Sequence, residues 1–128
     1  MAWRSRTSPE HVETAADETR PLDLVAGCRL TVTVSGGSTW RHKPLYCEIV
    51  RRAKVHGLAN TLAFHAMEGF GLDGVIHTTR SLTLTDGLPL WIVAVDEEAR
   101  IMSFLPEVAA FRAVESIVVD QVRQFVPR

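Results

Sequence analysis

The chain has 128 residues, of which 46% are hydrophobic and 23% charged, a composition typical of a globular protein with one packed domain. The apolar run over residues 88–95 is far shorter than the roughly 20 residues of a membrane-spanning helix, so we expect no membrane span. The formal net charge of −1 excludes an overall basic surface for nucleic acid. Cys28 and Cys47 belong to no paired motif, and the N-terminus lacks the apolar stretch of a secretion signal, so a cytoplasmic protein is expected.

Residues 1–24 differ in composition from the rest of the chain. They carry five acidic residues and three arginines but few large apolar side chains, which is typical of a disordered segment. We therefore predict a disordered N-terminal tail over residues 1–24 and one folded domain over residues 25–128.

The first strand is predicted around residues 29–34, where Leu30, Val32 and Val34 alternate with polar residues. A helix is then predicted from Pro44, a residue suited to a first helical turn, to a C-terminal cap at Gly57. The residues expected to face the core are Leu45, Tyr46, Ile49, Val50 and Ala53. Those expected to lie in solvent are Glu48, Arg51, Arg52 and Lys54.

Residues 60–67 are predicted to form a second strand. Its two faces consist of Leu62, Phe64 and Ala66 on one side and Ala63, His65 and Met67 on the other. Both faces are largely apolar, so we expect helices to cover one face and another subunit to cover the other. The sequence therefore predicts an oligomer.

A long flexible excursion is predicted over residues 68–87, because three glycines lie close together and the segment ends in the turn signal Asp86-Gly87. Residues 88–95 are predicted to form a third, buried strand. Asp96 is expected to cap a second helix, and Pro106 is expected to kink or restart that helix. The apolar stripe expected on it consists of Ile101, Met102, Leu105 and Val108. A last strand is predicted over residues 116–122.

The predicted order of elements is strand, helix, strand, strand, helix, strand. This order closes most simply as an α+β, ferredoxin-like βαββαβ sandwich with both helices on one face of the sheet.

Five short strings follow one another between residues 28 and 108: WRHKPLYCEIVRRA, EGFG, IHT, DGLPLWIVAVD and SFLP. Together they resemble the domain of unknown function 190 family (DUF190, also UPF0166), whose members look like relatives of the PII signalling proteins. The resemblance implies a PII-like homotrimer that binds small effectors, often adenine nucleotides, in clefts between subunits at the base of a long T-loop. It also implies a membrane transport or channel protein as the regulated partner.

One part of the chain departs from the PII pattern. PII proteins carry a Gly- and Lys-rich phosphate-gripping loop between the second helix and the last strand, whereas this chain has AAFRAVES over residues 109–116. We therefore expect AMP, ADP or a cyclic nucleotide to bind in preference to ATP, and we expect no cofactor.

The ligand site is expected around the segment WRHK and the glycine-rich string GFG. Glycines let the backbone approach a ligand closely, and Trp40 offers a stacking surface beside cations at a helix N-terminus. The candidate ligand-binding residues are Trp40, Arg41, His42, Lys43, Gly69, Phe70, Gly71, His77, Thr78 and Arg80. Two alternatives remain open: Trp40 packs at the edge of the core or at an interface, and the glycines only form a turn.

Other classes of function are less well supported by the sequence. The residues His42, His65, His77, Glu68 and Asp73 match no known metal-ligand spacing, so no metal site is expected. The chain has no GxSxG, HExxH or P-loop motif, so no enzyme is expected. The alternatives are a structural or cation-tolerance-like trimer without a nucleotide role, and a small enzyme that uses His65 or His77 as a base.

Overall fold

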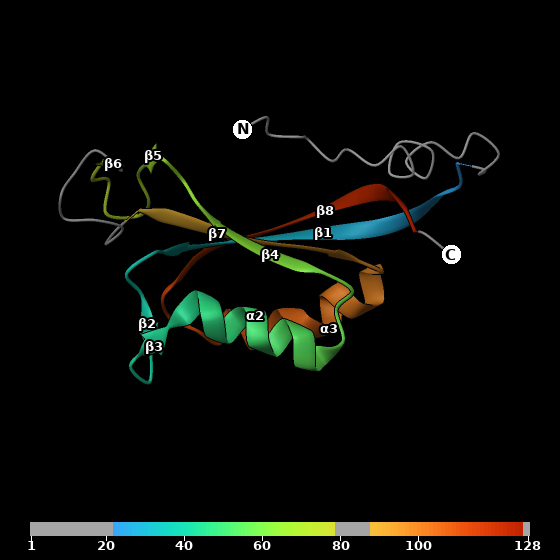
Figure 1. Cartoon of the computed structure of the whole chain (residues 1–128), viewed down its shortest axis with the longest axis horizontal. Coiled ribbons are helices and arrows are strands. Elements are labelled where there is room, and N and C mark those ends of the chain that lie inside the picture. The colour runs from blue at the N-terminus through green and yellow to red at the C-terminus, as the bar shows by residue number, and fades with distance from the viewer. Residues whose placement is uncertain (1–21, 79–87, 127–128) are drawn as a thin grey trace, which may run out of the picture.

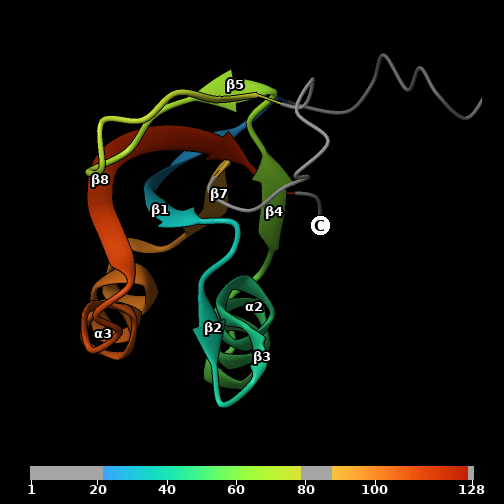
Figure 2. The ribbon, with the colours of Figure 1, turned by 90° about the vertical axis from the view of Figure 1, so that its left-hand side faces the viewer.

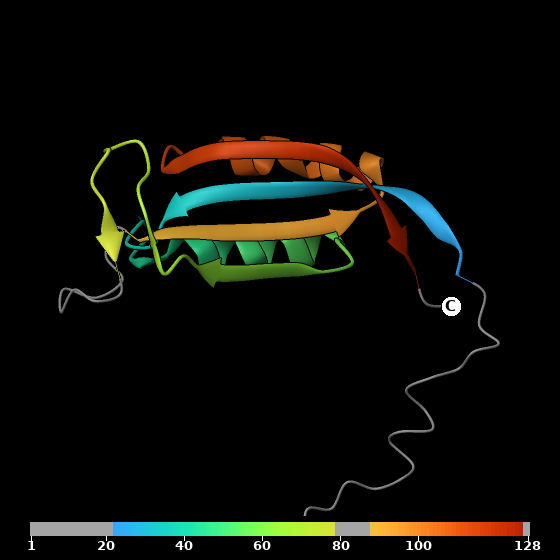
Figure 3. The same ribbon diagram turned by 90° about the horizontal axis from the view of Figure 1, so that it is seen from above.

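The computed structural model describes residues 22–78 and 88–126 (Figure 1). Four strands form one antiparallel sheet in the order β4-β7-β1-β8. Their bounds are β1 Leu24–Ser35, β4 Thr61–His65, β7 Pro89–Asp96 and β8 Val114–Phe125. Helices α2 (Leu45–His56) and α3 (Glu98–Ala109) both lie on one face of this sheet (Figures 1 and 3). The ferredoxin-like βαββαβ sandwich is confirmed.

Two pairs of short strands stand outside the main sheet. β2 (Thr39–Trp40) pairs with β3 (Lys43–Pro44), and β5 (Glu68–Gly69) pairs with β6 (His77–Thr78). Both pairs leave the same end of the sheet. There the Gly36 N–H donates to the Leu88 carbonyl at 2.8 Å, and the Ala66 N–H donates to the Pro89 carbonyl at 2.8 Å. The predicted long excursion therefore starts and finishes at this end, and its residues 79–87 lie outside the described part of the chain.

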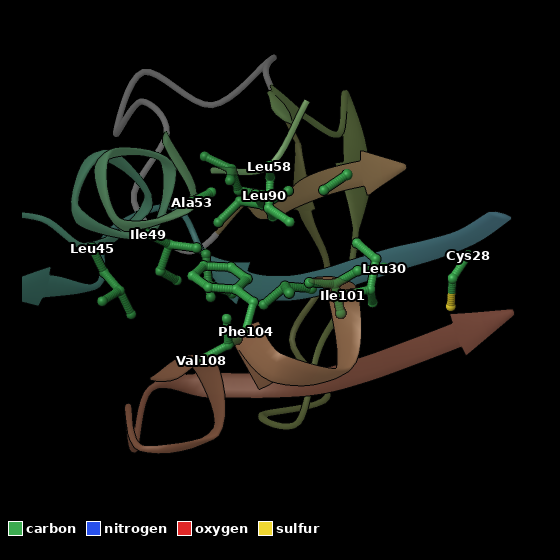
Figure 4. Packing of buried hydrophobic residues seen from close by; sticks show 14 residues of the cluster. Cys28, Leu30, Leu45, Ile49, Ala53, Leu58, Leu90, Ile101, Phe104 and Val108 are labelled. Carbon is green, nitrogen blue, oxygen red and sulfur yellow. The ribbon is translucent and has the colours of Figure 1, made fainter. Parts of the chain in front are cut away.

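The core fills the space between the sheet and the two helices (Figure 4). The predicted alternation holds in β1, where Leu30, Val32 and Val34 are buried beneath the helices. The predicted cap of α2 is also confirmed, because Gly57 adopts the left-handed conformation with a φ of 96°. Leu45, Ile49 and Ala53 of α2 are buried, as expected.

The apolar stripe of α3 differs from the sequence-based prediction. The buried residues are Ile101, Phe104 and Val108, whereas Met102 is 48% exposed. A spacing of three and then four residues places these buried residues on one side of the helix, and the first turn of α3 sets which side faces the sheet. The helix also continues through Pro106 in its last turn, so of the two predicted effects of this proline, a kink or a restart, the restart does not occur.

Asp96 is buried, but it does not cap α3 as predicted, because the N-cap is Glu97. Its carboxylate accepts hydrogen bonds from the backbone N–H of Glu97 at 2.7 Å and of Ala59 at 2.8 Å. Asp96 thus ties the segment after α2 to the start of α3.

The two strands of the β1–β8 pair are longer than predicted. Residues 24–27 of β1 pair with residues 122–125 of β8 beyond the end of β7, and they form a projecting two-stranded ribbon (Figure 3). Leu24, the last residue assigned to the tail, is the first residue of β1. Residues 1–21 lie outside the described part of the chain, so the disordered tail stays a prediction.

Candidate functional site

The β2–β3 hairpin carries four of the candidate ligand-binding residues. Trp40 pairs with Lys43 across a two-residue turn, in which Arg41 and His42 have φ values of 48° and 66°. Turns of this kind favour Asn-Gly, since most residues other than asparagine and glycine are strained at positive φ. The hairpin is tied to the start of α2 by the Leu45 N–H, which donates to the Ser38 carbonyl at 2.9 Å. It therefore presents three exposed side chains, Arg41, His42 and Lys43, beside a helix N-terminus.

Trp40 is half-buried, and its ring already has neighbours. The guanidinium carbon of Arg41 lies 4.5 Å from the Trp40 ring centroid, and that of Arg52 lies 5.1 Å away. Arg52 also lies 4.6 Å from the Phe111 ring, which contacts Trp40 edge-on at 6.3 Å between centroids. Packing of Trp40 at the edge of the core is therefore confirmed. A ligand ring that stacks on Trp40 would compete with these guanidinium groups for the ring.

Glu48 holds this cluster together, although the helical pattern predicted that it would lie in solvent. Its side chain is only 5% exposed and receives hydrogen bonds from Arg51 at 2.6 and 3.0 Å and from Arg52 at 2.9 Å. These hydrogen bonds lower the pKa of Glu48 to about 2, against the opposing effect of burial. The signal was present in the sequence, because arginines three and four residues after a glutamate lie on the same side of a helix.

This ion-pair cluster predicts a specific loss of stability in acid. A carboxylate whose pKa is lowered on folding stabilises the fold above its unfolded pKa, and that contribution is lost as the pH falls from about 4.5 to about 2. Glu48→Gln should therefore flatten the dependence of melting temperature on pH in this window. Glu98→Gln, which removes an exposed carboxylate from α3, is the matched control. An equal dependence of melting temperature on pH for wild type and Glu48→Gln would contradict the prediction.

The β5–β6 pair carries most of the remaining candidate residues. Gly69 pairs with His77 and Glu68 with Thr78, so residues about ten apart in sequence are neighbours here. The connecting segment passes over the end of the sheet from the β4 edge toward β8 (Figure 2). It exposes four large apolar side chains, which are Phe70, Leu72, Val75 and Ile76. Arg80 lies outside the described residues.

Gly71 makes the close backbone approach expected of this glycine cluster, but the neighbour belongs to the same chain. A Cβ on Gly71 would overlap the Glu115 carboxylate of β8. The carboxylate thus occupies the space on the side of Gly71 where a side chain would project. Spacing along the sequence gives no means of pairing two residues 44 positions apart.

Gly71→Ala should therefore push the Glu115 side chain away and destabilise the fold by about 1 kcal/mol, the lower end for overpacking, since a flexible side chain yields. Thermal unfolding of Gly71→Ala, Glu115→Ala and the double variant measures this coupling. In the Glu115→Ala background, Gly71→Ala should cost less. Strict additivity of the two changes would show that the contact carries no energy.

A single chain keeps the two groups of candidate residues apart. The β2–β3 hairpin lies on the helix side of the sheet, whereas the β5–β6 pair lies beyond its other face (Figures 1 and 2). They leave the same end of the sheet on opposite sides (Figures 1 and 2).

The sheet face opposite the helices, here called the open face, is not covered by the described residues of the chain. A hollow of about 710 Å³ on it is lined by Arg29, Thr31, Thr33, Leu62, Phe64, Trp91, Val93, Ser116, Val118 and Asp120. Leu62 is 66% exposed, and Phe64 and Trp91, each 48% exposed, contact each other edge to face at 6.1 Å between centroids. The expected uncovered apolar face of the second strand is therefore present. The expected burial of its other face by helices is wrong, since Ala63 and His65 on this edge strand are exposed.

In the described parts of the chain, residues 22–78 and 88–126, three or more His, Cys, Asp or Glu side chains nowhere gather in a way that could hold a metal ion. Within the same residues, neither helix is long and apolar enough to cross a membrane.

Comparison with known proteins identifies the family. The model of the family DUF190, described as Uncharacterized ACR, matches residues 27–124. The chain belongs to the DUF190 family. A UPF0166 protein from Aquifex aeolicus (strain VF5) is 32% identical over 79 residues, which cover 62% of this chain and 75% of that relative. The resemblance seen in the sequence motifs is confirmed.

Solved structures place this DUF190 chain in the PII-like fold. CPII, a nitrogen regulatory PII-like protein from Thiomonas intermedia K12 bound to ADP, AMP and bicarbonate, matches with a TM-score of 0.57 at 19% identity. The match covers 84% of this chain and 94% of that one. A PII-like protein from Thermus thermophilus matches with a TM-score of 0.56 at 15% identity, over 81% of this chain and 92% of the other. At these identities the likeness shows the fold alone.

Proposed function

We propose that this DUF190 protein is a PII-like regulator. It assembles as a homotrimer, binds an adenine nucleotide between subunits, and reports the bound state through the segment between β4 and β7. The observation that carries this proposal is the likeness of nearly the whole domain to CPII, which is itself bound to ADP and AMP. The effector changes the state of the segment only if it binds one of its conformations more tightly than the others.

The positions of the candidate residues support a site between subunits. The hairpin with Arg41 and Lys43 and the loop with Gly69 and Gly71 leave the same end of the sheet on opposite sides. A neighbouring subunit would bring one group against the other. The open face supports the required assembly, because Leu62, Phe64 and Trp91 leave apolar surface for a second copy to bury.

The short connection after α3 supports a preference for mono- or diphosphates. Only four residues, 110–113, separate α3 from β8, and they form a tight turn in which the Phe111 N–H donates to the Val108 carbonyl at 3.2 Å. The Phe111 ring lies against Arg52 and Trp40. This turn therefore leaves no loop that could wrap around a triphosphate.

Titration calorimetry with AMP, ADP, cyclic AMP and ATP tests the proposal. We expect AMP, ADP or the cyclic nucleotide to bind more tightly than ATP. If Lys43 contacts a phosphate, Lys43→Ala should weaken binding by about 1–3 kcal/mol. Lys54→Ala, which removes an exposed lysine from the last turn of α2, should leave binding unchanged.

Two results would contradict different parts of the proposal. No heat from any of the four nucleotides at millimolar concentration would remove the nucleotide role. Tightest binding by ATP would overturn the argument from the short turn after α3.

The partner of the regulator is proposed to be a membrane transport or channel protein. The segment between β5 and β6 supports a protein contact, because its exposed apolar side chains form a surface that a partner can bury. Native co-purification with and without the nucleotide, compared with a variant that carries Leu72→Ser and Ile76→Ser, tests this contact.

A second candidate function is a structural trimer without a nucleotide role. Two contacts favour it: Arg41 covers the Trp40 ring, and the Glu115 carboxylate lies against Gly71. In this arrangement the Trp40 ring and Gly71 already contact side chains of the same chain. An assembled protein that binds no nucleotide in the calorimetry would support this second function.

A further inference from the structure

The open face carries an ion pair that lies directly across two neighbouring strands. Arg29 of β1 stands opposite Asp120 of β8 in the strand register. The guanidinium donates twice to the carboxylate, with N···O distances of 2.6 and 3.1 Å. Among the residues that line the hollow, these two are the charged ones, and both side chains are about half exposed. The lining therefore carries no net charge.

The other residues that line the hollow form an apolar part and a polar part of the open face. Apolar side chains dominate over β4 and β7, where Leu62, Phe64 and Trp91 lie. Hydroxyl groups and the ion pair dominate over β1 and β8, where Thr31, Thr33 and Ser116 lie. Both parts line the same hollow, so a partner that fills the hollow also removes water from the ion pair.

The net charge of the open face indicates which kind of molecule covers it. Exposed aromatic side chains on the open face of such a sheet can also stack the bases of single-stranded nucleic acid. Binding of that kind needs free basic side chains for the phosphates, and here Asp120 already neutralises Arg29. A second copy of the chain brings the same apolar residues and the same neutral balance of charge, so it is the occupant that fits.

We propose that the Arg29–Asp120 ion pair makes self-association of this protein sensitive to the loss of either residue alone. The inference rests on the proposed assembly through the open face. When the face is covered, a complete pair enters the interface with its two charges and its hydrogen bonds satisfied. If one partner is removed, the other is buried as an unpaired charge, and this opposes association. If apolar residues replace both, no unpaired charge is buried and association is not opposed.

Sedimentation equilibrium of five proteins tests this inference: wild type, Arg29→Met, Asp120→Leu, the double variant, and Lys54→Met as a control on the helix side. Each single variant should weaken self-association by about 10- to 100-fold, because an unpaired charge is buried. The double variant and the control should associate as wild type does. A swapped pair, Arg29→Asp with Asp120→Arg, should recover association as well, and circular dichroism should confirm that each variant folds.

The outcomes separate this inference from the proposed function. Wild type that stays a monomer at every concentration would overturn the assembly and this inference with it. Wild type that assembles while both single variants assemble equally well would overturn only the role of the ion pair. Tight binding of a single-stranded oligouridine by wild type, lost in Trp91→Ala, would show that nucleic acid covers this face instead.

Discussion

Trp91→Asp should convert the assembled protein into a monomer. Sedimentation equilibrium of wild type at micromolar concentration should give three times the chain mass of 14.2 kDa, and the variant should give 14.2 kDa. Trp91 lies on the open face with half of its side chain exposed and contacts Phe64. Aromatic residues at the centre of an interface commonly contribute about 2 kcal/mol or more, and a buried unpaired carboxylate adds to the loss, so association should weaken by at least about 100-fold.

Val55→Asp is the matched control for this result. Val55 is 76% exposed on α2, in the helix layer on the other side of the molecule. The same change of chemistry there should leave the mass unchanged. A monomeric wild type, or a Trp91→Asp variant that remains three times the chain mass, would contradict assembly through the open face.

Phe104→Ala should cause the largest loss of stability of any single truncation considered for this protein. The ring is 1% exposed and packs between the sheet and the two helices (Figure 4). Truncation of a buried Phe costs about 3–5 kcal/mol, because apolar contacts are lost and a cavity remains. In a domain of this size the melting temperature should fall by roughly 10–20 °C. Thermal unfolding at fixed protein concentration measures the effect.

Met102→Ala on the same helix separates the observed packing from the predicted stripe. The sequence pattern placed Met102, and not Phe104, on the buried side of α3, whereas the structure exposes Met102. The Met102 variant should therefore change stability by at most about 0.5 kcal/mol, as expected of an exposed position. A loss comparable to that of Phe104→Ala would mean that α3 is rotated about its axis.

The fold could be predicted because its elements carry clear local signals. Alternation in β1 and the cap at Gly57 are properties of neighbouring residues, and the order of elements leaves few ways to close the sheet. The rotation of α3 was harder to predict, since Phe104 and Met102 are both large and apolar. The structure buries Phe104 and leaves Met102 exposed, a choice that the hydrophobicity of the two residues alone does not make.

The candidate site was predicted less completely, because its contacts join distant residues. The hairpin and the β5–β6 pair were both identified as segments, but their placement on opposite sides of the sheet depends on the tertiary fold. The approach of Glu115 to Gly71 and that of Phe111 to Arg52 cannot be read from spacing. The burial of Glu48 was missed for a different reason: charged residues on a helix are mostly exposed, and the two arginines that satisfy this one were assigned to solvent individually.

The turn of the β2–β3 hairpin bears on how this protein would respond to selection. Arg41 and His42 occupy a backbone conformation that Asn and Gly adopt more easily, so the present pair lowers the stability of the turn. A library randomised at these two positions and sorted for heat resistance alone should drift toward Asn-Gly. If the proposed nucleotide contacts this turn, the same library sorted for nucleotide binding should keep basic side chains there. Divergence of the two populations would show that the hairpin is maintained for what its side chains contact, at the expense of the turn itself.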